Sequence, residues 1–281
     1  MPLLAIPYPI IDPIAIHIGP LAIRWYGLAY MAGILLGWLY GRYLISRGDL
    51  WNGKPPMTVS QGDDFLLWIT LGIVAGGRLG FVLFYEPSYF WANPLEIPAV
   101  WNGGMSFHGG LLGVVIAVYL FSRRNAINPL SLGDVASAAT PFGLFFGRVA
   151  NFINAEVVGR ESDVPWAMVF PGAGDLPRHP SQLYEAALEG VVLFIILAVA
   201  TWRYKALTRP GTIFGLFLVF YGIFRSLVEL VREPHLGHPL DIGIFTPGIL
   251  YSIPMILIGI WLIWRARTKP LFAAKTSDAR S

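Results

Sequence analysis

The sequence contains no cysteine, and only 13% of its 281 residues are charged. The missing cysteines exclude disulfides, thiol nucleophiles and cysteine-ligated metals. Soluble domains carry about 25% charged residues, so the low charge argues against a soluble fold. Hydrophobic residues make up 55% of the chain. The composition therefore predicts a membrane protein.

No polar segment is long enough to form a second domain, so we expect a single membrane domain over residues 1–281. The first 20 residues contain no Lys or Arg. A signal peptide begins with basic residues, so we expect none here. The end of the chain, residues 270–281, is small and polar, and we predict a disordered cytoplasmic tail.

Seven apolar segments approach the length of about 20 residues with which a helix crosses a bilayer core. They cover residues 22–45, 63–85, 106–121, 132–154, 183–202, 212–231 and 244–264. The fold class that we predict is an all-α, polytopic integral membrane protein with seven transmembrane helices. Ten Trp and twelve Tyr support it, because these side chains favour the level of the lipid headgroups.

The loops between the segments differ in charge. Basic residues gather in the first, third and fifth loops and after the last segment, whereas the alternate loops hold most of the loop acids. Because basic loops stay on the cytoplasmic side, we place the N-terminus outside and the C-terminus in the cytoplasm. The same distribution explains the net charge of +3, which therefore does not indicate nucleic-acid binding.

Polar residues follow at steps of three near the end of the fourth segment, in GRVANFINAEVVGR: Arg148, Asn151 and Asn154. Such steps keep side chains on one side of a helix. Burying a guanidinium in a bilayer costs at least a few kcal/mol, so it needs a partner there. We interpret this face as a site for the phosphate of a lipid headgroup. Asn154 alternatively only caps the helix end.

The sixth segment carries a narrow polar stripe of four residues, Tyr221, Arg225, Glu229 and Arg232. An ion pair between Arg225 and Glu229 that only joins helices is one explanation of the stripe. We favour anion binding for Arg225, because more arginines than acids lie at this level.

Two further residues have both a functional and a structural explanation. Arg78 lies in GIVAGGRLG, whose glycines allow close helix approach; it binds substrate or pairs with an acid such as Glu185. His108 precedes two glycines in WNGGMSFHGGLLG, and imidazole titrates near neutrality without perturbation. We favour catalysis for His108, with Tyr26 as its hydrogen-bond partner, over a purely structural role.

With this orientation, polar groups of six segments lie in the outer half of the membrane, which predicts a site open to the outer leaflet. Ser106 has no G-x-S-x-G motif around it, and His235 and His238 are not part of an H-E-x-x-H motif. We therefore expect no metal site and no cofactor. The rival interpretations are a transporter or scramblase of anionic lipids and an intramembrane serine protease that uses Ser106.

Six sequence blocks resemble the bacterial phosphatidylglycerol–prolipoprotein diacylglyceryl transferases: RWYGLAY, GGRLGFVLFY, GGMSFHGGLLG, GRVANFINAEVVGR, RHPSQLYEAALEG and YGIFRSLVELVREP. The resemblance runs from about Arg24 to the last segment. Two departures are Ala155, where glycine is usual, and Val158, where tryptophan is expected.

The resemblance implies a seven-helix enzyme of the bacterial inner membrane that catalyses the first step of lipoprotein maturation. Its substrates would be phosphatidylglycerol and the lipobox cysteine of a prolipoprotein signal peptide, and it would release glycerol phosphate. The resemblance also assigns importance to a set of positions: Tyr26, His108, Arg148, Asn151, Gly159, Tyr221 and Arg225, together with Glu156 and Glu229.

A mechanism follows as a hypothesis. His108, oriented by Tyr26, would deprotonate the thiol, and Arg148 and Arg225 would hold the phosphate, since a guanidinium can bind it in a bidentate manner. The remaining positions bind phosphatidylglycerol in this hypothesis: Asn151, Glu156, Gly159, Tyr221, Glu229 and Arg78.

Overall fold

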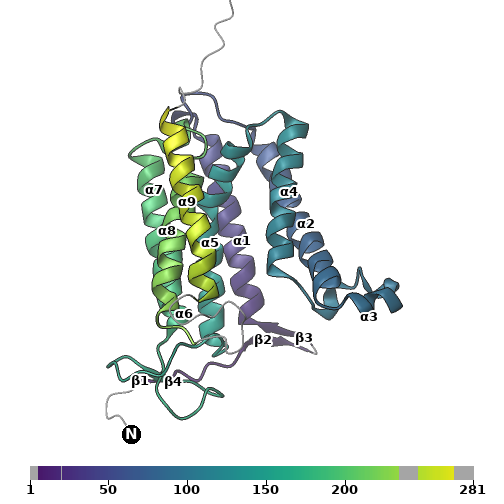
Figure 1. Cartoon of the computed structure of the whole chain (residues 1–281), viewed down its shortest axis with the longest axis vertical. Helices are drawn as coiled ribbons and strands as arrows, with labels where there is room; N and C mark the ends of the chain where they lie inside the picture. The colour runs from purple at the N-terminus through teal and green to yellow at the C-terminus, as the bar shows by residue number, and fades with distance from the viewer. Residues whose placement is uncertain (1–5, 20, 234–245, 269–281) are drawn as a thin grey trace, which may run out of the picture. The chain divides into compact units, whose positions relative to one another are not determined.

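The structure is a computed structural model that describes residues 6–19, 21–233 and 246–268. It is mostly helical (Figure 1). The chain divides into two compact units, one formed by Met1–Tyr40 with Ala136–Ser281 and the other by Gly41–Val135. Each unit is described by itself below, and the single membrane domain stays a prediction. The tail 270–281, His235 and His238 lie outside the described residues.

A helix covers most of each of the seven predicted segments, although the first segment begins in strand β3 (Leu21–Arg24) and residues 244 and 245 of the last lie outside the described residues. The corresponding helices are α1 (Trp25–Ser46), α2 (Val59–Phe84), α4 (Phe107–Asn125), α5 (Pro129–Ile153), the continuous segment Ser181–Trp202, α8 (Thr212–Glu229) and α9 (Pro247–Thr268). Among the described residues, five of them are long and apolar enough to cross a membrane: α1, α2, Ser181–Trp202, α8 and α9. The seven crossings and the orientation remain predictions.

The segment Ser181–Trp202 is not a uniform α-helix. It consists of α6 (Ser181–Glu185), a π-helical part η4 (Ala186–Val192) and α7 (Leu193–Trp202). A π-helix has a wider turn than an α-helix and is frequent at functional sites. The hydrophobic pattern did not predict the π-helical part, because most residues of the segment are apolar and fit either type of helix.

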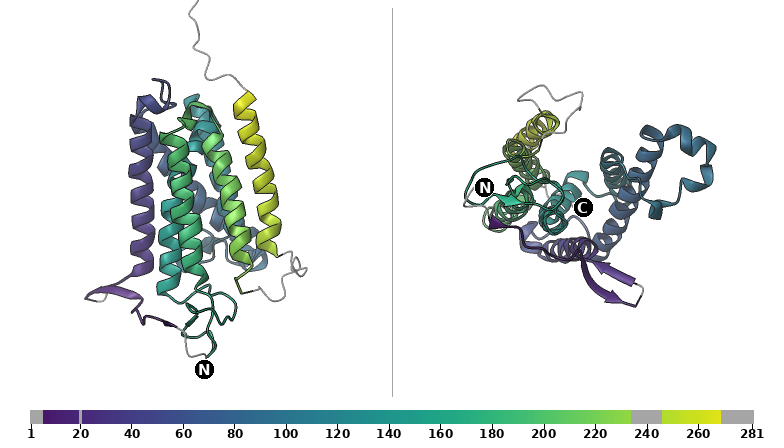
Figure 2. Two further views of the ribbon diagram at one scale, coloured as in Figure 1. Left: turned by 90° about the vertical axis from the view of Figure 1, so that its left-hand side faces the viewer. Right: turned by 90° about the horizontal axis from the view of Figure 1, so that it is seen from below.

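Glycines let the helices of the first unit pack closely. Helices α8 and α9 run side by side (Figure 2), and a Cβ atom on Gly215 would lie 2.8 Å from the carbonyl oxygen of Gly259. Between α1 and α7, the Tyr40 and Phe194 rings pack against each other with centroids 5.4 Å apart. The glycines therefore set the distance between the helices that carry the polar residues.

Short strands and a loop lie at the end of α5 in the first unit. Strand β1 (Ile6–Pro7) pairs in parallel with β4 (Met168–Val169), and β2 (Ile14–Ile18) pairs antiparallel with β3 (Leu21–Arg24). The Tyr8 hydroxyl donates to the carbonyl oxygen of Phe152 at 2.7 Å, which satisfies a terminal carbonyl of α5. The N-terminal segment thereby fixes the helix end that carries Asn151.

The second unit is built on the contact between α2 and α4. It also contains α3 (Pro87–Ala92) and three 3-10 turns: η1 (Gly48–Leu50), η2 (Pro94–Glu96) and η3 (Val100–Asn102). Gly76 on α2 faces Gly109 and Gly113 on α4 so closely that a Cβ on Gly76 would overlap their backbone. This confirms the expectation that the glycines around Arg78 allow close helix approach.

Candidate active site

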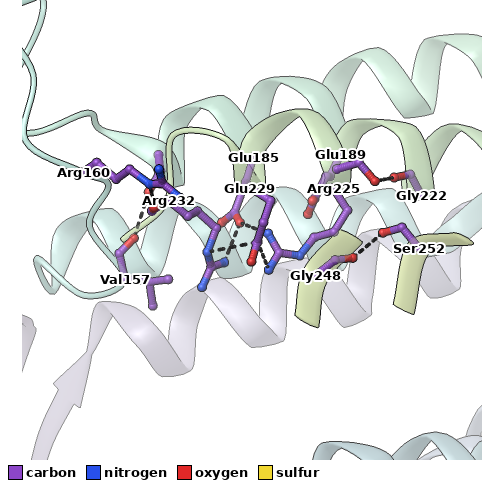
Figure 3. Close-up of polar contacts among 12 residues, drawn as sticks. Val157, Arg160, Glu185, Glu189, Gly222, Arg225, Glu229, Arg232, Gly248 and Ser252 are labelled. Carbon is purple, nitrogen blue, oxygen red and sulfur yellow. Dashed lines mark hydrogen bonds and ion pairs between the residues drawn. The ribbon is translucent and has the colours of Figure 1, made fainter. Parts of the chain in front are cut away.

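Three arginines of the first unit converge on one buried glutamate. The Nε atom of Arg148, on α5, lies 3.0 Å from Glu185 Oε2. On the other carboxylate oxygen, Oε1, Arg232 Nη1 lies at 2.7 Å and Arg225 Nη1 at 3.5 Å. Figure 3 shows the side chains of Arg225 and Arg232 turned toward Glu185. The two arginines predicted to bind phosphate are thus neighbours that share a carboxylate.

Two more glutamates complete this group. Glu229 Oε2 lies 2.6 Å from Arg225 Nη2, and Glu189 Oε2 lies 3.7 Å from Arg148 Nη2. We call the six residues the buried charge cluster: Arg148, Glu185, Glu189, Arg225, Glu229 and Arg232. Its three positive and three negative formal charges cancel, so the expected excess of arginines over acids is not found within it.

The structure corrects the predicted stripe on the sixth segment. Helix α8 ends at Glu229, and the backbone of Arg232 instead pairs with Gly159 in an isolated β-bridge. Tyr221 lies one helical turn before Arg225 and stacks on Phe217, with ring centroids 5.6 Å apart. The pair of Arg225 with Glu229, left open by the sequence, does form.

Local features of the backbone bring the glutamates into place. Gly190 follows Glu189 in η4, and a Cβ atom there would lie 2.7 Å from Phe145 Cβ on α5. The glycine therefore permits the approach of η4 to α5 that brings Glu189 beside Arg148. Similarly, a Cβ on Gly248 of α9 would lie 2.5 Å from Glu229 Oε2.

A second polar group lies where α5 ends. Asn151 Nδ2 donates to Glu156 Oε2 at 3.2 Å, and Asn154 Nδ2 donates to Glu156 Oε1 at 3.3 Å. Asn151 also interacts with the hydroxyl of Tyr26, which lies 3.3 Å from the hydroxyl of Tyr30. The structure thus joins Tyr26, Asn151 and Glu156, which lie far apart along the chain, in one group.

The loop after α5 is held against α6. Gln182 Nε2 donates to the carbonyl oxygen of Glu156 at 2.5 Å, and Ser181 Oγ donates to that of Val157 at 3.0 Å. Gly159 is buried in this loop, where a Cβ would lie 2.6 Å from the carbonyl oxygen of Val231. Gly159 therefore permits a close backbone contact, and a role in substrate binding stays a prediction.

His179 ties the same loop to α6 through a neutral imidazole. Burial lowers the pKa of His179 below its ordinary value of 6.5. Its Nδ1 atom lies 3.1 Å from the Tyr184 hydroxyl, which accepts a hydrogen bond from Trp166 Nε1 at 2.6 Å. Tyr184 therefore connects Trp166 in the loop to His179 through two hydrogen bonds, and the tautomer of the imidazole determines which partner donates in the second.

His108 and Ser106 belong to the second unit, at the start of α4. Ser106 is the N-cap, and its hydroxyl accepts from the amide of Gly109 at 3.2 Å. This capping role explains the serine without a nucleophilic function. His108 lies in the first turn, with its ring 5.6 Å from that of Phe107. Because Tyr26 belongs to the other unit, its pairing with His108 stays a prediction.

Arg78 is buried in the second unit, and its described partners are main-chain carbonyls instead of an acid. Its guanidinium donates to Glu96, Ile97 and Gly103 at 2.6–2.8 Å and to Gly104 at 3.3 Å. It also lies over the ring of Phe90. These bonds use most of its donors, so Arg78 holds the 96–104 loop. Because Glu185 belongs to the other unit, its pairing with Arg78 stays a prediction, as does substrate binding by Arg78.

A cavity of about 510 Å³ lies elsewhere in the first unit. Its walls come from the N-terminal segment and the loop around β4: Tyr8, Ile10, Val169, Phe170, Pro171, Gly172, Gly174 and Asp175. No member of the buried charge cluster lines it. The candidate site therefore depends on the charged residues and not on this cavity.

Sequence reasoning missed Glu189 and Gly248, and named Glu185 only as a partner of Arg78. The signal for the two glutamates was their spacing of four residues in RHPSQLYEAALEG, which places both on one side of a helix. Two acids within a predicted membrane span are rare and indicate a functional or paired site. Gly248 gave no signal, because its contact is with a residue of another helix.

Comparisons with known proteins agree on one family. The model of the family described as prolipoprotein diacylglyceryl transferase matches residues 13–265. A relative from Nitrobacter winogradskyi is 54% identical over 280 residues, covering 99% of this chain and 95% of the relative. One from Rhodopseudomonas palustris is 53% identical over 287 residues and covers both chains fully. Both relatives carry the name phosphatidylglycerol–prolipoprotein diacylglyceryl transferase.

Proposed function

The chain belongs to the prolipoprotein diacylglyceryl transferase family, and from this membership we propose that it transfers the diacylglyceryl group of phosphatidylglycerol to a prolipoprotein. The acceptor is the thiol of the lipobox cysteine, and glycerol phosphate is the second product. The reaction is the first step of lipoprotein maturation.

The observation that carries this proposal is the convergence of Arg148 and Arg225 on Glu185. Arg225 Nη1 is buried, and its described contact is the long ion pair with Glu185 Oε1 at 3.5 Å, without a hydrogen bond. Buried donors are normally hydrogen-bonded, so a donor that makes only this long ion pair, near a second guanidinium, suits a phosphate oxygen. The side chains of Arg148 and Arg225 keep 21% and 17% of their surface exposed, which leaves them accessible to a headgroup.

In the proposed reaction, the cysteine sulfur forms a bond to the terminal glyceryl carbon of the diacylglyceryl group. The bond from that carbon to the phosphate oxygen breaks, and its electron pair leaves with glycerol phosphate. A free thiol has a pKa of about 8.5, so a base is needed near neutral pH. His108 takes this proton, and Tyr26 orients the imidazole of His108.

The other polar residues bind different parts of the lipid headgroup or hold the residues that bind it. Arg148 and Arg225 bind the phosphate, whose negative charge increases on the leaving group as the bond breaks. Asn151 and Tyr221 contact the phosphate or the glycerol hydroxyls, and Glu156 fixes the amide of Asn151 through the bond at 3.2 Å. Glu229 holds the Arg225 guanidinium at 2.6 Å, and Gly159 keeps the loop close to the helices.

This function requires a site at the outer leaflet of the bacterial inner membrane, where secreted prolipoproteins arrive. We propose seven membrane crossings, the N-terminus outside and the C-terminus in the cytoplasm. The five long apolar helices and the charge difference between alternate loops support this arrangement.

The test is mass spectrometry of a lipobox peptide after incubation with phosphatidylglycerol and the purified protein. We expect a diacylglyceryl thioether on the cysteine. Arg148→Lys keeps the charge but loses the bidentate geometry, so we expect its rate to fall at least about tenfold, which corresponds to one lost charged hydrogen bond. Arg47→Lys is the matched control, since Arg47 pairs with Asp49 at the surface. An unmodified peptide, or full activity of Arg148→Lys, contradicts the proposal.

A further inference from the structure

Glu189 differs from the other two glutamates of the buried charge cluster. Like Glu185, it has no exposed side-chain surface, but neither of its carboxylate oxygens accepts a hydrogen bond from a described residue. The nearest cation is Arg148 Nη2, at 3.7 Å. Glu185 and Glu229, in contrast, have a guanidinium nitrogen within 2.7 Å and 2.6 Å. A buried carboxylate with so few partners is costly in its charged form.

The formal charge of the buried charge cluster changes when a phosphate binds. Its formal charges cancel when all three glutamates are ionised, and a phosphodiester brings one further negative charge. Uncompensated charge is expensive where the dielectric constant is low. When Arg148 turns toward the phosphate, Glu189 also loses part of its interaction with its nearest cation. One added proton restores the balance, and Glu189 is the carboxylate with the fewest partners to lose.

We propose that Glu189 takes up one proton when the phosphate of an anionic lipid binds to the buried charge cluster. The inference rests on the proposed function, because it assumes that the phosphate binds at Arg148 and Arg225. Lipid binding and protonation are then linked, and the affinity for the lipid falls as the pH rises. After the product leaves, the proton is released and the ion pair with Arg148 forms again.

The surroundings of Glu189 determine which group takes the proton. Charged and titratable side chains interact with it electrostatically from α5, from α6, and from α8 with the segment that follows: Arg148, Glu185, Tyr221, Arg225 and Arg232. Glu185 is held by guanidinium nitrogens on both oxygens. Glu229 is held by Arg225 and lies against Gly248 at the first turn of α9, where the positive end of the helix dipole favours a carboxylate.

The experiment is isothermal titration calorimetry of phosphatidylglycerol into the detergent-solubilised full chain, without a peptide acceptor. Measurements at one pH in buffers of different ionisation enthalpy give the number of protons bound with the lipid. We expect the wild type to take up about one proton, and its Kd to rise with pH by at most about tenfold per pH unit. Glu189→Gln mimics the protonated side chain, so it should take up no proton and show a pH-independent Kd.

Infrared difference spectroscopy on lipid addition provides a second readout if Glu189→Gln does not fold. The wild type should gain a band of a protonated carboxyl group, and that band should shift in Glu189→Asp. Lipid binding that depends on Arg148 but brings no proton uptake, or uptake that Glu189→Gln retains, overturns the inference and leaves the proposed function intact. Absence of lipid binding, or binding that Arg148→Lys does not weaken, instead contradicts the proposed function.

Discussion

At the residue scale, His108 lies in the first turn of α4, just after the N-cap Ser106 and next to Gly109, which packs against α2. The glycine contact fixes the backbone of the first turn, so the position of the imidazole is determined by the contact of two helices. A base on such a rigid element is well suited to proton transfer, because general bases must lie within hydrogen-bond reach of the proton.

Replacing the imidazole of His108 tests whether it acts as a base or only positions the substrates. His108→Gln keeps a polar side chain but cannot accept the thiol proton, so peptide alkylation at pH 7 should fall at least about 100-fold. Activity should recover partly above pH of about 8.5, where cysteine ionises without a base. The control is His17→Gln, in strand β2. Wild-type activity at pH 7, or no recovery at high pH, would show that His108 is not the base.

Ala155 has an unusual backbone conformation for a residue with a Cβ atom. It follows the end of α5 with a φ of +54°. The amide of Glu156 bonds to the carbonyl oxygen of Asn151 at 2.9 Å, and that of Ala155 to Phe152 at 3.0 Å. This is a Schellman motif with Ala155 at the position where glycine is favoured. The left-handed backbone thus gives a conformational reason for the glycine that the family resemblance leads us to expect at this position.

Glycine should therefore stabilise this turn. A left-handed conformation costs a residue with a Cβ roughly 1 kcal/mol, so Ala155→Gly should raise the free energy of unfolding and the Tm in detergent. Ala150→Gly is the matched control, because it lies within α5 and should lower stability by about 1 kcal/mol. The two substitutions should have opposite signs. A decrease for both would mean that Ala155 is not strained.

At the scale of elements, close helix contacts determine where the polar residues lie. The polar stripes on the fourth and sixth segments were predicted from helical spacing, and α5 and α8 carry all of their residues except Asn154 and Arg232, which follow the helix ends. The partners were harder to predict, because Glu185 and Glu189 are separated from Arg148 by a long loop. The sequence also gave no sign of the π-helix that contains Glu189, since its apolar neighbours fit an α-helix equally well.

The contact between α2 and α4 depends on Gly113. A Cβ there would fall on the carbonyl of Gly72, a backbone group that cannot move alone. Gly113→Ala should force the helices apart and lower the free energy of unfolding by about 1–3 kcal/mol, as overpacking does. Gly143→Ala is the control, because a Cβ there meets nothing within 4 Å. Thermal unfolding in detergent compares the two, and equal Tm values would mean that α2 and α4 tolerate the side chain.

At the scale of the whole molecule, composition and periodicity were sufficient to predict a helical membrane protein. The helix positions follow from the apolar segments, because a helix that crosses a bilayer needs about 20 consecutive, mainly apolar residues. The role of Arg78 did not follow, since its partners are main-chain carbonyls of a loop whose path no pattern predicts. The neutral formal charge of the buried charge cluster could not be predicted either, because the sequence does not show which glutamates lie beside which arginines.

The central claim is that Arg148 and Arg225 together hold an anionic lipid headgroup. Native mass spectrometry of the protein released from nanodiscs with equal amounts of phosphatidylglycerol and phosphatidylcholine measures this preference directly. The wild type and Arg47→Lys should retain mainly phosphatidylglycerol. In Arg225→Lys the preference should fall about tenfold, the equivalent of roughly 1.4 kcal/mol. Equal retention of phosphatidylglycerol by the wild type and by the double variant Arg148→Lys/Arg225→Lys would contradict the account.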